Sequence, residues 1–553
     1  MKRLGILLLL LAASVLAEAQ IATGIYWVQF TDKDNSPYSI DVPEQYLSQR
    51  ALDRRARLGI AIDEYDLPVN PQYLQAVANC GVELLNPSKW LNGVTVHVDD
   101  PEVLAAVNAL PFVQAVRNCP EDPAAQETKQ RWMEQELKVS GSPVVARDFY
   151  GGAHDQVYQL KVNELHDMGY DGTGVVIAVL DGGFIGTDIH PCFDNMREEG
   201  RLLGVRDFVY GCTSVYSHHT HGTSCLSTIG AYDPYNMVGT APKASFYLIH
   251  TEDTRSESIL EEYNWVSGAE YADSVGVDLC TTSLGYIRFD LEQWNHPFAH
   301  FDGHTAPMTI GTEIAASRGI ICTTSASNEG SSWNGECTLG IPADAEHTIT
   351  VGAVNAAGER ADFSSVGPTY DGRIKPDVMA MGEGTYVASG DLGGWYGNYY
   401  NGNGTSFSNP VLAGAVACLR QAFPHASVQE ICDVVRQCGN RASSPDNENG
   451  YGIPDFAAAF DALHVEDTFV QKTELVEVFP NPSDGHIHIR MKEGYQAEID
   501  VFDLLGRHLE SYHFNGLNHT TLERFLEGLA SGVYLLKATS EEGSQTLKFV
   551  IAK

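Results

Sequence analysis

Apolar and polar positions along this chain change their period several times, and each change predicts a domain boundary. Over residues 20–118 the apolar positions alternate as in strands at 25–30, 93–98 and 112–116, and recur as in helices at 43–58 and 101–110. This order predicts a small α+β domain of ferredoxin-like topology. Residues 119–150 are polar and hold Pro120 and Pro123, which indicates a linker open to proteolysis.

Residues 151–463 combine short apolar strands with helical patterns. The clearest strand runs cover 175–180, 246–249, 320–323 and 348–352. Apolar strands that alternate with helices predict an α/β domain built on a parallel sheet.

The pattern changes again after residue 463. Residues 464–473 are expected to form a linker, and residues 474–553 alternate with period two between Pro, Asn and Gly. The predicted strands are 476–479, 487–489, 497–502, 533–538 and 546–551. This last segment therefore predicts an all-β sandwich that forms a domain of its own.

The first residues have the features of an export signal. Lys2 and Arg3 precede an apolar run over 4–16, and Ala17-Glu18-Ala19 forms a small-x-small cleavage pattern. The run is shorter than the ~20 apolar residues that a membrane-spanning helix needs. We therefore expect residues 1–19 to be the signal peptide of an exported protein.

Acidic residues greatly outnumber basic ones: 72 Asp and Glu stand against 35 Lys and Arg, a formal net charge of −37. Such a surface repels phosphate backbones and anionic lipids, so nucleic acid is not an expected partner. The charge fits either a soluble exported protein or calcium binding, although the sequence has no complete EF-hand loop.

Because the number of cysteines, 11, is odd, at least one thiol has no disulfide partner within the chain. The candidate disulfide pairs are Cys192/Cys212 and Cys322/Cys337. Neither a CxxC pair nor a Cys/His cluster suggests a zinc site.

Four polar residues follow predicted strands or begin predicted helices, where side chains can face a cleft. Asp181 follows the strand at 175–180 and precedes two glycines; taken alone, it is more typical of a helix N-cap than of a site residue. His221 begins a helical run, and together with His218 and His219 it raises a metal interpretation, but the ligand spacing of zinc peptidases is missing.

Ser406 and Asn328 complete this group. Ser406 lies at the start of an apolar helix over 411–419, where the helix N-terminus favours developing negative charge, and it is not part of a G-x-S-x-G elbow. Asn328 lies on a turn after the strand at 320–323, where it either donates its amide N–H to a site or forms an Asx turn.

The order Asp, His, Asn, Ser, with the residues around each, resembles the subtilisin-like serine peptidases of the S8 family over residues 155–463. The matching motifs are Val179-Leu180-Asp181-Gly182-Gly183, His221-Gly222-Thr223, Gly404-Thr405-Ser406 with Pro410, Gly239–Ala244, Thr282–Gly285, Lys375–Asp377 and Gly450–Asp455. The resemblance implies a three-layer fold around a parallel sheet. It also implies that Ser406 is the nucleophile, His221 the general base, Asp181 its orienting carboxylate and Asn328 the oxyanion donor. No cofactor is implied for the chemistry, although family members often hold structural calcium.

The resemblance also implies the substrate-binding residues, which are Ser283, Leu284, Gly285, Ala326, Ser327 and Gly340. Gly340 would form the floor of the first specificity pocket and leave room for a large apolar P1 side chain. No acidic residue marks that floor, which favours broad specificity. Gly182, Ser327 and Phe407 depart from the family's usual Ser or Thr, Gly and Met, but none of them removes a reacting group. Cys225 lies one helical turn from His221, where it is either a small buried residue or the thiol of thiol-dependent subtilases, which mercurials inhibit.

Both flanking domains extend the resemblance. Residues 20–118 resemble the inhibitor propeptide of subtilisin-like enzymes. Residues 474–553 resemble the type A C-terminal sorting domain of the type IX secretion system; a carbohydrate-binding sandwich is the alternative. The segments that carry this match are Phe479–Pro482, Val501–Arg507, Gly528–Tyr534 and Lys548–Lys553.

The sequence therefore predicts a secreted or surface-attached, monomeric serine endopeptidase. Its partners would be peptide substrates, its own propeptide and the secretion machinery. The alternative is a catalytically inactive subtilisin fold that binds peptides.

Overall fold

The computed structural model of the chain describes residues 24–119, 148–332, 337–391, 398–470 and most of 476–552. It contains two compact units, residues 1–459 and 460–553. The predicted signal peptide and nearly all of the predicted linker at 119–150 lie outside the described residues. Within the described part of the chain, no helix has both the length and the apolar character needed to cross a membrane.

The N-terminal domain is a four-stranded antiparallel sheet in the order β2-β3-β1-β4. Its elements are β1 Ile25–Phe30, α2 Gln49–Leu58, α3 Pro71–Asn79, β2 Glu83–Ser88, β3 Gly93–His97, α4 Pro101–Asn108 and β4 Val113–Asn118. This order confirms the ferredoxin-like prediction. The helix predicted over 43–58 is shorter than expected, because Pro43–Gln45 forms only one 3-10 turn. Ser48 then caps α2 by accepting the N–H of Ala51 at 3.2 Å.

The central domain holds a seven-stranded parallel sheet in the order β13-β12-β11-β10-β5-β9-β6. The strands are β5 Val176–Asp181, β6 Leu202–Asp207, β9 Ser245–His250, β10 Leu279–Thr282, β11 Ile321–Ser325, β12 Thr348–Val354 and β13 Val378–Met381. Every residue of β5, β10, β11, β12 and β13 is buried, which explains why these runs do not alternate between apolar and polar positions. The predicted α/β class with a parallel sheet is confirmed.

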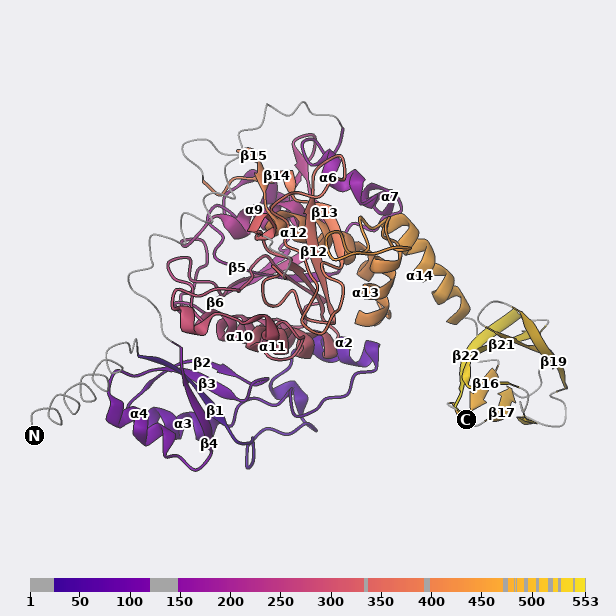
Figure 1. Ribbon diagram of the computed structural model, residues 1–553, viewed down its shortest axis with the longest axis horizontal. Helices are drawn as coiled ribbons and strands as arrows, with labels where there is room; N and C mark the ends of the chain where they lie inside the picture. Colours follow the sequence, from indigo (N-terminus) through magenta and orange to yellow (C-terminus); the bar gives the residue numbers. More distant parts are fainter. Residues whose placement is uncertain are drawn as a thin grey trace, which may run out of the picture. The chain divides into compact units, whose positions relative to one another are not determined.

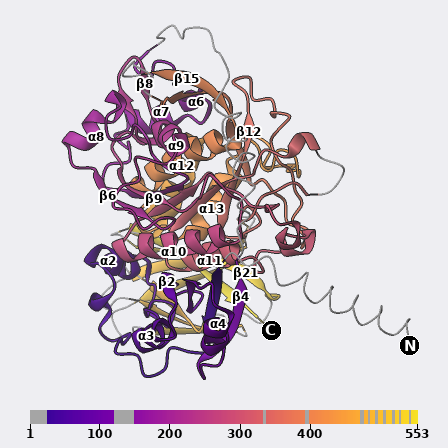
Figure 2. The same ribbon diagram turned by 90° about the vertical axis from the view of Figure 1, so that its left-hand side faces the viewer.

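Helices cover both faces of this sheet and produce the three layers (Figures 1 and 2). One face carries α9 and α12, and the opposite face carries α10 and α11. These helices are α9 His221–Gly230, α10 Leu260–Val275, α11 Pro307–Ser317 and α12 Thr405–Ala422. The smaller elements are α6 His154–Gln159, α7 Val162–Asp167, α8 Asp194–Glu198, β7 Tyr232–Asp233, β8 Met237–Val238, β14 Glu383–Ala388, β15 Tyr399–Asn403, α13 Val428–Gln437 and α14 Phe456–Val470.

The N-terminal domain packs against α10 through β2 and α2 (Figure 1). The carboxylate of Glu270 on α10 accepts the backbone N–H groups of Lys89 at 2.7 Å and Trp90 at 2.9 Å. The rings of Trp27 and Tyr263 stack with centroids 4.6 Å apart. The N-terminal domain is therefore joined to the central domain by both apolar and charged contacts.

One buried carboxylate, Asp273, concentrates the charge of this contact. It lies in the last turn of α10 and pairs with Arg54 at 2.5 Å, Arg55 at 2.9 Å and Lys89 at 2.9 Å, all from the N-terminal domain. Arg50 of α2 adds a hydrogen bond from Nε to the carbonyl of Gly276, which follows α10, at 2.9 Å. Cations at a helix C-terminus also interact favourably with the helix dipole.

The C-terminal unit contains two antiparallel sheets, in the orders β16-β17-β20 and β19-β18-β21-β22. Its strands are β16 Val476–Phe479, β17 His486–Met491, β18 Gln496–Asp503, β19 His508–Asn515, β20 Thr521–Phe525, β21 Gly532–Ser540 and β22 Gly543–Ile551. Buried residues of both sheets, among them Ile489, Val501 and Phe549, form one core, so the predicted sandwich is confirmed. The predicted linker at 464–473 is helical as far as Val470.

The predicted disulfide pairs Cys192/Cys212 and Cys322/Cys337 are wrong, because all four residues are free thiols. Cys192 is buried whereas Cys212 is exposed. Cys322 lies inside β11, whereas the sulfur of Cys337 accepts the N–H of Leu339 on a loop. Closeness in sequence therefore did not bring either pair together.

Candidate active site

Asp181 is the last residue of β5 and is fully buried. Its side-chain oxygen accepts the N–H of Gly182 at 2.7 Å. Gly183 has a φ of +138°, and a Cβ at this position would lie 2.4 Å from the backbone nitrogen of His219. Glycine is therefore needed where the loop that carries His221 passes close to the end of β5.

His221 begins α9, and its ring is held by Asp181. The Nδ1 atom lies 2.8 Å from Oδ1 and 3.0 Å from Oδ2 of Asp181. Since a carboxylate only accepts, Nδ1 carries the proton and Nε2 is the atom able to accept one. Burial opposes a charge on His221, but the Asp181 carboxylate, with a smaller contribution from Cys225, raises its pKa well above the ordinary value.

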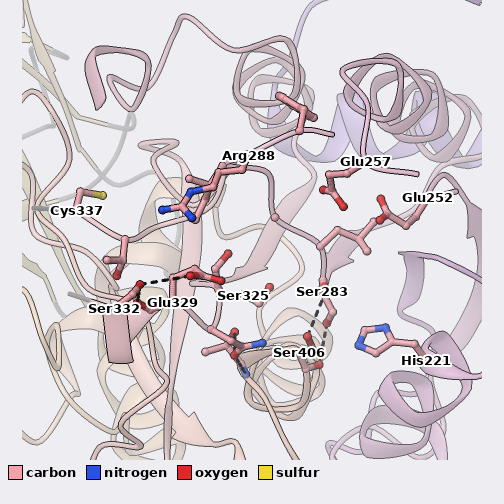
Figure 3. A pocket seen from close by; sticks show the side chains of 18 of the residues that line it. His221, Glu252, Glu257, Ser283, Arg288, Ser325, Glu329, Ser332, Cys337 and Ser406 are labelled. Carbon is pink, nitrogen blue, oxygen red and sulfur yellow. Dashed lines mark hydrogen bonds between the residues drawn. The ribbon is translucent and has the colours of Figure 1, made fainter. Parts of the chain in front are cut away.

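Ser406 is the second residue of α12 and shares a cavity of about 440 Å³ with His221. Figure 3 shows the two side chains next to each other, with Ser283 beside them. The Ser406 hydroxyl contacts the carbonyl oxygen of Ser283 at 3.4 Å, and the Ser283 hydroxyl donates to the Ser406 carbonyl at 2.9 Å. The structure thus brings His221 and Ser406, which are far apart in sequence, to one cavity wall, and Asp181 is buried behind His221.

Asn328 lines the same cavity on the turn after β11. Its amide oxygen accepts the backbone N–H of Thr405 at 2.9 Å and the Thr405 hydroxyl at 3.0 Å. Because these donors fix the oxygen, the NH₂ group of Asn328 takes the opposite side of the amide. The arrangement suits donation of a hydrogen bond to a charge that develops near Ser406.

The predicted substrate-binding residues fall into two groups. Ser283, Leu284, Gly285 and Ser327 line the cavity. Ala326 is fully buried and is not among the lining residues.

Gly340 faces Ser327 instead of the cavity. A Cβ added at Gly340 would lie 2.2 Å from Oγ of Ser327, and one added at Gly285 would lie 2.5 Å from it. The Ser327 hydroxyl therefore fills the space between these two glycines. Ser327 itself has a φ of +86°, a conformation that non-glycine residues seldom adopt.

Sequence reasoning missed a charged part of the cavity wall, formed by Glu252, Glu257, Arg288 and Asp290. Figure 3 shows Glu252 and Glu257 above His221. Glu252 is almost fully buried and accepts a hydrogen bond from the Tyr286 hydroxyl. The acidic stretch 252–262 is visible in the sequence, but no pattern places it at the cavity.

Cys225 lies directly beneath the site. Its sulfur is 3.8 Å from Nδ1 of His221 and 3.3 Å from the carbonyl oxygen of Ser406. The residue is buried, and burial raises the pKa of its thiol to about 11 despite the opposing effect of His221. Cys225 is therefore both a packed residue and a thiol within reach of the proposed reacting groups.

A parallel sheet that brings a buried Asp–His pair and a helix-borne serine to one cavity defines a candidate site of the serine hydrolase type. The chain belongs to the subtilase family, whose model matches residues 172–452. The Peptidase S8 propeptide domain of Bacteroidota matches residues 25–134. The secretion system C-terminal sorting domain matches residues 477–552, which indicates export to the cell surface or beyond.

Several curated proteins are similar to the central domain. Subtilisin NAT of Bacillus subtilis subsp. natto is 33% identical over 283 residues, which are 51% of this chain and 64% of that protein. Subtilisin of Bacillus pumilus is 33% identical over 271 residues, covering 48% of this chain and 84% of that protein. The chain thus spans just under two thirds of the length of Subtilisin NAT.

Proposed function

We propose that the protein is an exported serine endopeptidase whose triad is Asp181, His221 and Ser406. The observation that carries this proposal is the buried Asp181–His221 pair, with Nδ1 to Oδ1 at 2.8 Å, whose His221 lines the same cavity as Ser406 and Asn328. A serine hydroxyl needs a base at neutral pH, and an imidazole whose other nitrogen is held by a carboxylate is suited to that role.

In the proposed mechanism, Nε2 of His221 takes the hydroxyl proton while Oγ of Ser406 attacks the scissile carbonyl. Asp181 holds the ring tautomer and stabilises the imidazolium that forms. The tetrahedral oxyanion accepts hydrogen bonds from Asn328 and from the backbone N–H of Ser406 at the start of α12. His221 then gives its proton to the leaving amine, and water repeats the sequence on the acyl-enzyme.

Substrate would bind as an extended strand between residues 283–285 and 326–328, through main-chain hydrogen bonds. Broad specificity is proposed, since Leu284, Gly285 and Ser327, the residues of these segments that line the cavity beside Ser283 and Asn328, carry no charge. The N-terminal domain is proposed to inhibit the enzyme before its removal, and the C-terminal domain to engage the secretion machinery as the chain leaves the cell. The monomeric state and structural calcium stay predictions.

A fluorophosphonate probe, which reacts with activated serines, tests the proposal. The processed wild-type enzyme is expected to be labelled and S406A is expected not to be. S408A is the matched control, because Ser408 lies in the same helix and its hydroxyl bonds only the carbonyl of Thr405 among its described contacts. If the processed wild type is not labelled, the protein is an inactive peptide-binding member of the family, and the proposal is wrong.

A further inference from the structure

Three different metal-binding groups meet at the end of β6, outside the proposed catalytic machinery. They are the carboxylate of Asp207, the thiol of Cys212 and the imidazole of His218, and their ligand atoms all lie within 4.8 Å of one another. In the sequence, His218 belongs to the histidine group that raised a metal interpretation, but no motif spacing connects it with Asp207 and Cys212. The fold joins them because the loop from β6 to α9 turns back on the end of the strand.

Hydrogen bonds from the protein itself hold the side chain of the first ligand, Asp207, in place. It is 3% exposed, and its Oδ1 accepts from the backbone N–H groups of Val209 at 2.9 Å and Tyr210 at 3.1 Å and contacts Nδ1 of His250 at 2.9 Å. These contacts direct Oδ2 toward the loop, where it accepts the N–H of Cys212 at 3.1 Å. Metal sites commonly hold a ligating carboxylate by such outer hydrogen bonds.

His218 and Cys212 complete the set. Nε2 of His218 lies 3.6 Å from Oδ2 of Asp207, and its ring stacks on that of His250 with centroids 4.4 Å apart. Cys212 is exposed, which gives an ion a path from solvent. A carboxylate, a thiolate and an imidazole form a ligand set typical of zinc, whereas calcium and magnesium prefer oxygen ligands alone.

We propose that Asp207, Cys212 and His218 form a binding site for a divalent ion of the zinc class. Binding forms bonds from the ion to Oδ2, Sγ and Nε2, displaces water from the ion and releases the thiol proton of Cys212 to solvent. Affinity therefore rises with pH until the thiol is fully deprotonated. Because His218 stands three residues before His221, the bound ion would fix the loop that leads into α9.

Cobalt(II) provides the test, since a cobalt–thiolate bond gives a near-ultraviolet charge-transfer band that oxygen and nitrogen ligands do not give. The full chain carrying S406A, reduced and freed of metal, prevents self-digestion and separates this test from the proposed activity. One equivalent of cobalt is expected to bind with this band, and zinc is expected to remove it. C212S should abolish the band and H218Q should weaken binding at least tenfold, whereas C438S, at another partly buried cysteine of the same domain, should change neither.

A second measurement needs no ligand variant. Zinc is expected to slow alkylation of Cys212 by iodoacetamide at least tenfold, measured by mass spectrometry of the peptide. A cobalt–thiolate band that survives C212S would overturn the proposal. So would the absence of the band together with an alkylation rate that zinc does not change.

Discussion

The buried charges between α2 and α10 make a sharp prediction about the N-terminal domain. Arg54 is 1% exposed and Asp273 is fully buried, and the two side chains meet at 2.5 Å. Arg57, one turn further along α2, has a side chain that is 27% exposed and pairs with Asp278 at 2.9 Å. The two arginines share a helix and a partner surface but differ in burial.

Removing one partner from a buried ion pair costs about 3–5 kcal/mol, because the other charge stays buried without it. Asp273 keeps Arg55 and Lys89, so we take the lower end for R54A, about 3 kcal/mol, which is roughly 10²-fold in affinity. R57A removes a partly exposed ion pair worth about 0–1 kcal/mol, which lowers the affinity at most about fivefold. We therefore expect R54A to weaken binding of the N-terminal domain to the rest of the protein far more than R57A does.

The assay uses residues 20–118, produced separately, as an inhibitor of the processed enzyme with a chromogenic peptide substrate. The measured quantity is the inhibition constant of the wild-type domain, R54A and R57A. R57A is the matched control, since both changes replace arginine by alanine in α2 and affect its helix propensity alike. Equal losses for the two variants, or an R54A constant within fivefold of wild type, would refute the reasoning.

Three further predictions concern the active site. N328A should lower kcat about 10²–10³-fold with little change in KM in steady-state assays, the magnitude found for an asparagine donor in subtilisin itself. Because Asp181 raises the pKa of His221 and only the neutral ring accepts a proton, activity should fall on the acid side at a pH above the ~6.5 of free imidazole. In D181N this limb of the kcat/KM profile should move to lower pH, and kcat should drop about 10⁴-fold. A mercurial should inhibit the wild type slowly, since the pKa of about 11 keeps Cys225 protonated, and should leave C225A active; equal inhibition of both would contradict this.

Local sequence patterns predicted most of the fold. The strand over Val176–Asp181 could be predicted because it is a short buried run that ends in a carboxylate and two glycines. The start of α2 could not, because Pro43 is a good first residue of a helix and only the tertiary structure shows that the chain turns before Ser48 caps the helix.

The candidate active site was likewise predicted from the sequence only in part. The contact of Asp181 with His221 was expected from motif order, and the structure has it at 2.8 Å. The charged wall with Glu252 was not expected, because an irregular loop carries no periodicity from which its direction could be inferred. Ser327 appeared in the sequence only as a substitution, whereas its role between two glycines depends on backbone angles.

The charged contacts at the end of α10 have a consequence for the stability of the protein after processing. Asp273 and the carbonyl of Gly276 receive their cationic partners from the N-terminal domain, which we propose is removed on maturation. After that removal, the mature protein would keep a negatively charged helix terminus without the cations that neutralise it in the full chain. We expect the mature protein to be kinetically stable, protected by a high barrier to unfolding and not by its equilibrium free energy of unfolding. Once denatured, it would not refold without the N-terminal domain.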